Sequence, residues 1–140
     1  MQRPIMTSPS FLRIASAPAT AAEADLAVAR DLADTLAAHA EACVGMAANM
    51  IGVSKRIIVF ADEATGRAMT MFNPVIIAKA EPYGAEEGCL SLDGMRGTTR
   101  YRRITVTYQD RRMREHTAKF EGFTAQIIQH EVDHCDGVLI

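Results

Sequence analysis

The stretch Gln129-His-Glu-Val-Asp-His-Cys135 decides how the rest of the 140-residue chain is interpreted. His130 and His134 stand four residues apart, so an α-helix places both imidazoles on one face, about 6 Å apart along its axis. Two rings at that separation can bind one divalent metal. Glu131 follows the first histidine, where its carboxylate can take a proton from a water on the metal. This H-E-x-x-H pattern predicts a helix that carries a catalytic metal site; the alternative is an ordinary helix with two polar histidines.

A third metal ligand is expected elsewhere in the chain, because catalytic sites usually have three protein ligands and keep one position open. Cys89, within Glu86-Glu-Gly-Cys-Leu-Ser91, is the best candidate, since a thiolate binds zinc or iron(II) strongly. Cys135 directly follows His134, so its side chain should point about 100° around the helix and away from the metal. Cys43 is more simply interpreted as a small buried hydrophobe.

Composition limits the class of protein. The length fits a single domain over residues 1–140, and no apolar run approaches the ~20 residues of a membrane helix. A formal net charge of −2 makes nucleic acid an unexpected partner, so the arginines within 100–103 and 111–114 are interpreted as solvated strand ends and a turn. Three cysteines, an odd number, favour a reducing cytoplasmic location over a disulfide framework.

Hydropathy patterns predict helices at both ends of a strand-rich middle. Residues 1–19 should be mostly irregular, and the capping box Thr20-Ala-Ala-Glu23 predicts a helix that ends near Ala42. Strands are predicted at 56–60, 68–72, 75–78, 104–108 and 116–120, with Asn73-Pro74 stopping the second and the last two forming a hairpin. The final helix is predicted from Gly122 to about Asp136, followed by Gly137 as its left-handed C-cap.

The small-residue segment from Gly45 to Gly52 reads as a tight backbone segment. It either packs closely against the first helix or forms a wall that a ligand can approach.

Two intact motifs, Glu87-Gly-Cys-Leu-Ser91 and Gln129-His-Glu-Val-Asp-His134, resemble those of the peptide deformylases. Phe72-Asn-Pro74 and Met95-Arg-Gly97 are smaller similarities. Members of this family remove the formyl group from the N-terminal methionine of new proteins. The resemblance implies an α+β fold, in which mostly antiparallel strands pack around a C-terminal helix carrying HExxH, with an N-terminal helix. It also implies an N-formylated peptide or nascent-chain N-terminus as the partner.

The resemblance further implies a role for each site residue. Cys89, His130 and His134 would hold one divalent metal, natively iron(II), although zinc or nickel can occupy such a site. Glu131 would act as the general base, and the Leu90 backbone N–H would stabilise the oxyanion. Asp133 would pair with an arginine such as Arg100; the alternative is an exposed carboxylate on the helix surface. Val44, Gly45 and Arg96 would bind substrate.

The first family motif, Gly-x-Gly-Leu-Ala-Ala-x-Gln, is altered in this chain, which reads Cys43-Val-Gly-Met-Ala-Ala-Asn-Met50. Met50 stands where the family has a glutamine whose amide donates to the formyl oxygen. A thioether has no N–H to donate. Loss of one oxyanion donor typically lowers the rate by about 10²–10³.

Three functions are compatible with this pattern. The first is a working amide hydrolase of deformylase type, slow on formyl-methionyl peptides or adapted to a related formylated amine. The second is a non-catalytic, metal-containing relative that binds peptides or another partner. The third is a zinc protease outside the family; the cysteine ligand argues against it, because HExxH proteases usually complete their site with Glu or His.

Overall fold

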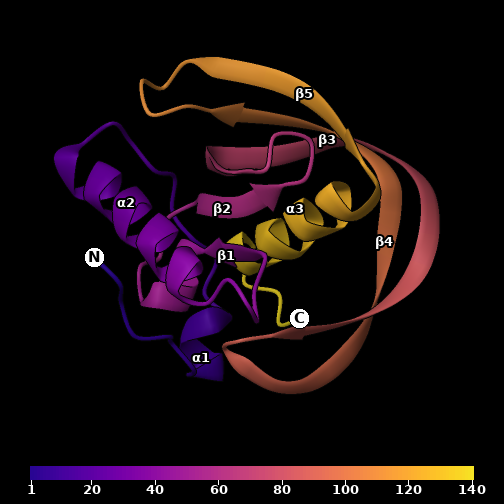
Figure 1. The fold of residues 1–140 in the computed structure, drawn as a ribbon, viewed down its shortest axis with the longest axis horizontal. Helices are drawn as coiled ribbons and strands as arrows, with labels where there is room; N and C mark the ends of the chain where they lie inside the picture. The colour runs from indigo at the N-terminus through magenta and orange to yellow at the C-terminus, as the bar shows by residue number, and fades with distance from the viewer.

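The fold is an antiparallel sheet that curves around one central helix (Figure 1). The computed structural model describes residues 1–140, and its five strands are ordered β1-β2-β3-β4-β5 in the sheet. The elements in chain order are α1 (Pro9–Leu12), α2 (Glu23–Ala38), β1 (Gly45–Ala47), the 3-10 helix η1 (Ala48–Ile51), β2 (Ile57–Asp62), β3 (Arg67–Cys89), β4 (Leu92–Gln109), β5 (Glu115–Glu121) and α3 (Gly122–Cys135). The α+β class, the antiparallel strands and the two terminal helices are therefore as predicted.

Strand β2 explains how the sheet holds a helix on each face. Its side chains alternate between the faces, as the pleat requires. Ile57 and Val59 join the hydrophobic cluster of α2, whereas Ile58 and Phe60 join the cluster that packs on α3. All four are fully buried, which accounts for the continuous apolar run in the sequence. None of the three α-helices has the length and apolar character that a bilayer span requires.

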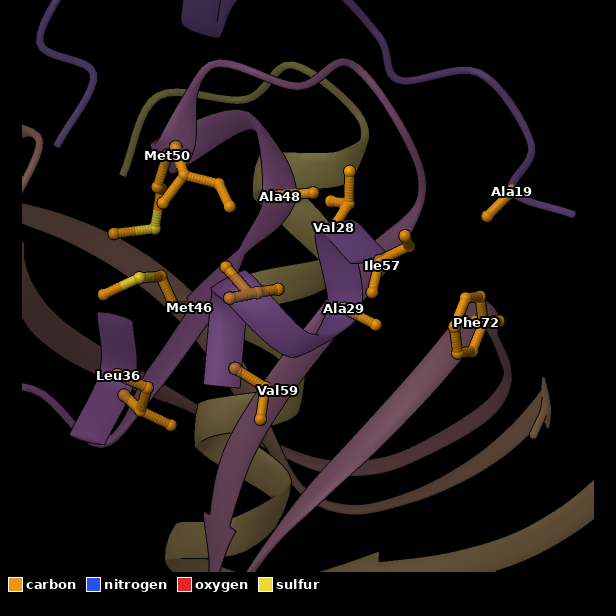
Figure 2. Close-up of a cluster of buried hydrophobic side chains, with 12 residues drawn as sticks. Ala19, Val28, Ala29, Leu36, Met46, Ala48, Met50, Ile57, Val59 and Phe72 are labelled. Carbon is orange, nitrogen blue, oxygen red and sulfur yellow. The ribbon is translucent and has the colours of Figure 1, made fainter. Parts of the chain in front are cut away.

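The small-residue segment from Gly45 to Gly52, which precedes β2, is held in place by the hydrophobic cluster under α2 (Figure 2). Leu36 and Ala29 of α2 pack in this cluster with Met46 of β1 and Met50 of η1. In Figure 2 the side chains of Met46 and Met50 extend to the same side of the cluster. The predicted packing of this segment against the first long helix is confirmed, and it places residues 45–51 between α2 and α3.

The start of α2 differs from the predicted capping box. The N-cap is Ala22 and makes no side-chain cap, while the Thr20 backbone N and Oγ1 both donate to Asp25 Oδ2, at 2.7 and 3.1 Å. Glu23 is exposed and pairs with Arg30 instead. Thr20 stands two residues before the N-cap, so Asp25 reaches it and Glu23 does not. The helix also ends at Ala38, earlier than predicted, and the irregular opening contains the short α1.

The prediction that Asn73-Pro74 stops a strand is wrong. β3 continues through this pair to Cys89, because the register against β4 shifts between Phe72 and Val75 and so accommodates the proline. Asn73 adopts a positive φ of 52°, and its side chain bonds to both backbone polar groups of Ala19. The predicted hairpin is confirmed as β4 and β5, joined by a turn around Asp110.

Candidate active site

Three metal-binding side chains converge from two elements. Cys89 is the last residue of β3, and His130 and His134 lie on successive turns of α3. Cys89 Sγ lies 3.4 Å from His134 Nε2, which lies 3.2 Å from His130 Nε2. All three donor atoms lie within 4.8 Å of one another. The structure therefore brings together the cysteine and the two histidines that the sequence singles out.

These donors suit a divalent metal. Bonds of about 2.3 Å to sulfur and 2.0–2.1 Å to nitrogen, arranged tetrahedrally, separate neighbouring donor atoms by about 3.3–3.6 Å. The two close separations, 3.4 and 3.2 Å, lie within about 0.2 Å of those values. One thiolate and two imidazoles form a set that zinc and iron(II) both accept. Cys135 is buried in the cluster under the sheet and does not join the set, as its helical position predicts.

His130 is oriented by a buried carboxylate. Its Nδ1 lies 2.8 Å from Glu87 Oε1, an arrangement that leaves Nε2 facing the other donors. Arg100 Nη2 donates to the same carboxylate at 2.7 Å, and Arg100 Nη1 donates to Asp133 at 2.7 Å, which is the ion pair that the resemblance implies. Arg100 is only 4% exposed, so its interpretation as part of a solvated strand end is wrong.

The surroundings of the two histidines shift their pKa values in opposite directions. Burial opposes charge on His130, but its bonds to Cys89 and Glu87 outweigh this effect and raise its pKa to about 10. Burial, reinforced by the charge of His130, lowers the pKa of His134 to about 3. Burial would also raise the pKa of Glu87, yet the bonds from His130 and Arg100 lower it to about 2. His134 is thus neutral, the form that binds metals, whereas a metal would have to displace the proton that these bonds stabilise on His130.

Glu131 is a buried carboxylate held against a glycine. It is 3% exposed, and its Oε1 has no hydrogen-bond partner. A Cβ on Gly45 would lie 2.9 Å from Glu131 Oε2, so only glycine fits beside it. Burial, opposed by the charge of His130, raises the pKa of Glu131 to about 7. A carboxylate with a pKa near the working pH suits a general base.

A cavity of about 400 Å³ adjoins these groups. Most of the residues singled out from the sequence line it: Val44, Gly45, Met50, Cys89, Leu90, His130 and Glu131. Two of the predicted site residues do not line it. His134 is fully buried, and Arg96 lies on β4 opposite Glu87, half-buried, with its Nη1 buried and unpartnered. Met50 is 1% exposed, so its side chain borders the cavity from within the α2 cluster.

Some residues of the cavity are not found by sequence reasoning. Phe123 is 48% exposed and lines the cavity together with Met95. Gln126 also lines the cavity, and its Nε2 donates to Glu87 at 2.9 Å while Tyr83 donates to its Oε1 at 3.3 Å. Gln126 precedes His130 by one helical turn, so its spacing in the sequence already places it on the helix face that carries the metal ligands.

Comparisons with known proteins agree with this geometry. Residues 3–140 match the family described as Polypeptide deformylase. A peptide deformylase of Clostridium beijerinckii is 51% identical over 140 residues, which are the whole of both chains.

Solved structures extend the comparison to the fold. The chain is similar to a class I type b peptide deformylase from Acinetobacter baumannii, crystallised with the ligand K1U, with a TM-score of 0.88 and 31% identity over 99% of this chain and 97% of that one. The same A. baumannii enzyme bound to Met-ala-ser gives a TM-score of 0.87 at 29% identity, with the same coverage. The chain therefore belongs to the polypeptide deformylase family.

Proposed function

We propose that this chain hydrolyses the formyl amide of N-formylmethionyl peptides, using one divalent metal held by Cys89, His130 and His134. The observation that carries the proposal is the position of Glu131, a buried carboxylate with an unpartnered oxygen in the cavity that two of the three converging donors, Cys89 and His130, also line. A carboxylate buried without an ion pair is costly to keep for structure alone. Its placement beside a metal-binding set is what a hydrolase requires.

The reaction adds water across the formyl C–N bond and releases formate and a free amine. A bound divalent metal would supply Lewis acidity and lower the pKa of a water enough to make it nucleophilic near neutral pH. Glu131 takes a proton from the attacking water and passes it to the leaving amine. The Leu90 backbone N–H, in the two-residue turn after Cys89, donates to the oxygen that becomes negative.

The cavity suits a methionine side chain followed by extended peptide. Its apolar lining includes three partly exposed residues, Val44, Met95 and Phe123. Val44 and Gly45 lie where β1 begins, and we assign them to contacts with the peptide. We assign Arg96, which lies outside the cavity, to a contact with a more distant part of the peptide. The Met-ala-ser bound A. baumannii relative supports a short methionyl peptide as the probe. Iron(II) is the native metal we propose, and the three free cysteines favour a reducing cytoplasm.

Met50 favours a second candidate, a metal-containing relative that binds peptides without turnover. The Met50 side chain brings no N–H donor to the cavity. Gln126, the amide side chain that lines the cavity, donates to Glu87. The partnerless Glu131 argues for the hydrolase. The two candidates make opposite predictions for turnover.

Formate release from formyl-Met-Ala-Ser separates the two candidates. Anaerobically purified protein loaded with iron(II) or nickel should release formate, and Glu131→Ala should lower kcat by about 10²–10⁴ while metal content stays unchanged. The control is Glu115→Ala, an exposed glutamate on β5, which should leave turnover intact. Metal-loaded protein that releases no formate would favour the binding protein, and full turnover by Glu131→Ala would exclude Glu131 as the base.

A further inference from the structure

The two histidine ligands differ in what holds the nitrogen that faces away from the metal site. His130 Nδ1 bonds to Glu87, whereas His134 Nδ1 is buried without a hydrogen-bond partner among the protein's groups. The His134 side chain is 0% exposed. Its Nε2 can offer a lone pair to a metal only if Nδ1 carries the proton. Because metal-bound histidines almost always donate that proton to an acceptor, His134 needs one nearby.

Asn49 is the polar side chain that bonds to residue 134. It comes from η1, is 0% exposed, and its Nδ2 donates to the His134 backbone carbonyl at 2.8 Å. This bond orients the amide, so that Oδ1 is the atom left free, and Oδ1 is also buried without a partner. An unpaired acceptor and an unpaired donor therefore belong to two residues that are already in contact.

A hydroxyl lies at the same junction. The Ser16 backbone N donates to the Cys135 carbonyl at 2.8 Å, and Ser16 Oγ is buried without a partner. The chain here packs tightly against the end of α3, since a Cβ on Gly137 would lie 2.4 Å from the Arg13 carbonyl oxygen. A donor, an acceptor and a hydroxyl, all buried and unpartnered, thus belong to residues that are tied to two successive carbonyls, those of His134 and Cys135, at the end of α3. Three polar partners are what a buried water requires.

We propose that Asn49 is a positioning residue for the metal ligand His134. Its Nδ2 fixes the backbone of the last turn of α3, and its Oδ1 receives the His134 Nδ1 proton through one buried water that Ser16 Oγ also binds. The inference rests on the proposed metal centre. Asn49 stands at the second variable position of the first family motif, Gly-x-Gly-Leu-Ala-Ala-x-Gln, next to the altered Met50, and the inference gives this position a role.

The test is the affinity of the purified protein for Co(II) alone, together with the absorption spectrum of the Co(II) form. Asn49→Ala should weaken Co(II) binding about 10–100-fold and shift the Co(II) bands, because His134 is no longer held in one orientation. The matched control is Thr35→Val on α2. Thr35 is equally buried, and the change removes its bonds to Arg3 and Asp31 without touching α3. It should lower the melting temperature while leaving Co(II) affinity and spectrum unchanged.

If the Asn49→Ala variant does not fold, a second measurement on the wild-type protein tests the inference. Long-range ¹H–¹⁵N spectra of the zinc-loaded wild type should show the His134 proton on Nδ1, in contact with a slowly exchanging water. A proton on Nε2, or no such water, overturns the inference. A folded Asn49→Ala that keeps wild-type Co(II) affinity and spectrum also overturns it, while the proposed function stands. Wild-type protein that binds no Co(II) overturns both.

Discussion

Gly45 has no side chain, and this leaves the space that Glu131, the proposed base, occupies. A Cβ at this residue would lie 2.6 Å from Ile127 Cγ2 and 2.9 Å from Glu131 Oε2, closer than real contacts allow. The first family motif keeps a glycine here even though its first and last residues are altered. The physical reason is the helix that carries Glu131, which leaves no room for a methyl group.

Replacement of Gly45 by alanine is predicted to displace Glu131. We expect kcat for formate release to fall at least tenfold and the free energy of unfolding to fall by about 1–3 kcal/mol, because the core is overpacked. Metal content should not change, since no ligand moves. The control is Gly84→Ala, where a new Cβ meets nothing within 4 Å. Equal kcat values for the wild type and Gly45→Ala would contradict this account.

Met50→Gln is predicted to restore the second oxyanion donor. If the cavity and metal are otherwise competent, kcat/KM on formyl-Met-Ala-Ser should rise by about 10²-fold or more. Met46→Gln is the matched control, because it makes the same change in the same cluster at a residue that does not line the cavity. It should destabilise the protein without a gain in turnover. No gain in Met50→Gln with metal bound would support the binding function instead.

At the scale of elements, the β3–β4 ribbon is what the sequence predicts least well. From Lys79 to Arg103 its side chains are mostly exposed, so the strands lack the alternation of buried and exposed residues on which strand prediction depends. The buried strand β2 and the helix α3 have strong apolar patterns and are predicted to within two residues. Glu87 and Arg100 meet because β3 pairs with β4, and they reach His130 and Asp133 because this ribbon lies against α3. No local sequence pattern reports such contacts.

The β4–β5 hairpin contains a carboxylate whose titration can be measured. The hydrogen bond from His116 at 2.9 Å, together with the backbone bonds from Arg114 and Arg112, lowers the pKa of Asp110 to about 2. A depressed carboxylate pKa stabilises the fold above the group's ordinary pKa, and this contribution is lost as the pH falls through about 2. In NMR titrations Asp110 should therefore titrate near 2, and His116→Ala should raise that value toward 3.8. His39→Ala should leave the titration of Asp110 unchanged; an unchanged midpoint in His116→Ala would contradict the assignment.

At the scale of the whole molecule, the sheet wraps around α3 (Figure 1), and charged side chains join the sheet to the helix. Arg100 on β4 bonds to Glu87 on β3 and to Asp133 on α3, and Glu87 in turn bonds to the metal ligand His130. The network therefore couples the closure of the sheet to the orientation of one ligand. The ligands themselves could be predicted from spacing and residue type, whereas this support requires the tertiary fold.

Removal of the Arg100 guanidinium should lower both the stability of the fold and the affinity for metal. Arg100→Ala leaves Glu87 buried without its cation, which should lower the free energy of unfolding by about 3–5 kcal/mol. Metal affinity should also fall, because Glu87 no longer holds His130 in one orientation. Arg103→Ala breaks the exposed pair with Glu81 and should cost no more than about 1 kcal/mol. Similar urea midpoints for the two variants would contradict the proposed role of Arg100.

X-ray absorption at the metal edge of anaerobically purified protein tests the proposed ligand set. We expect one metal per chain, with the Cys89 sulfur at about 2.3 Å from the metal and imidazole nitrogens of His130 and His134 at about 2.0–2.1 Å. Cys89→Ser should remove the sulfur contribution alone. A metal environment without sulfur in the wild type, or one without imidazole, would contradict the account.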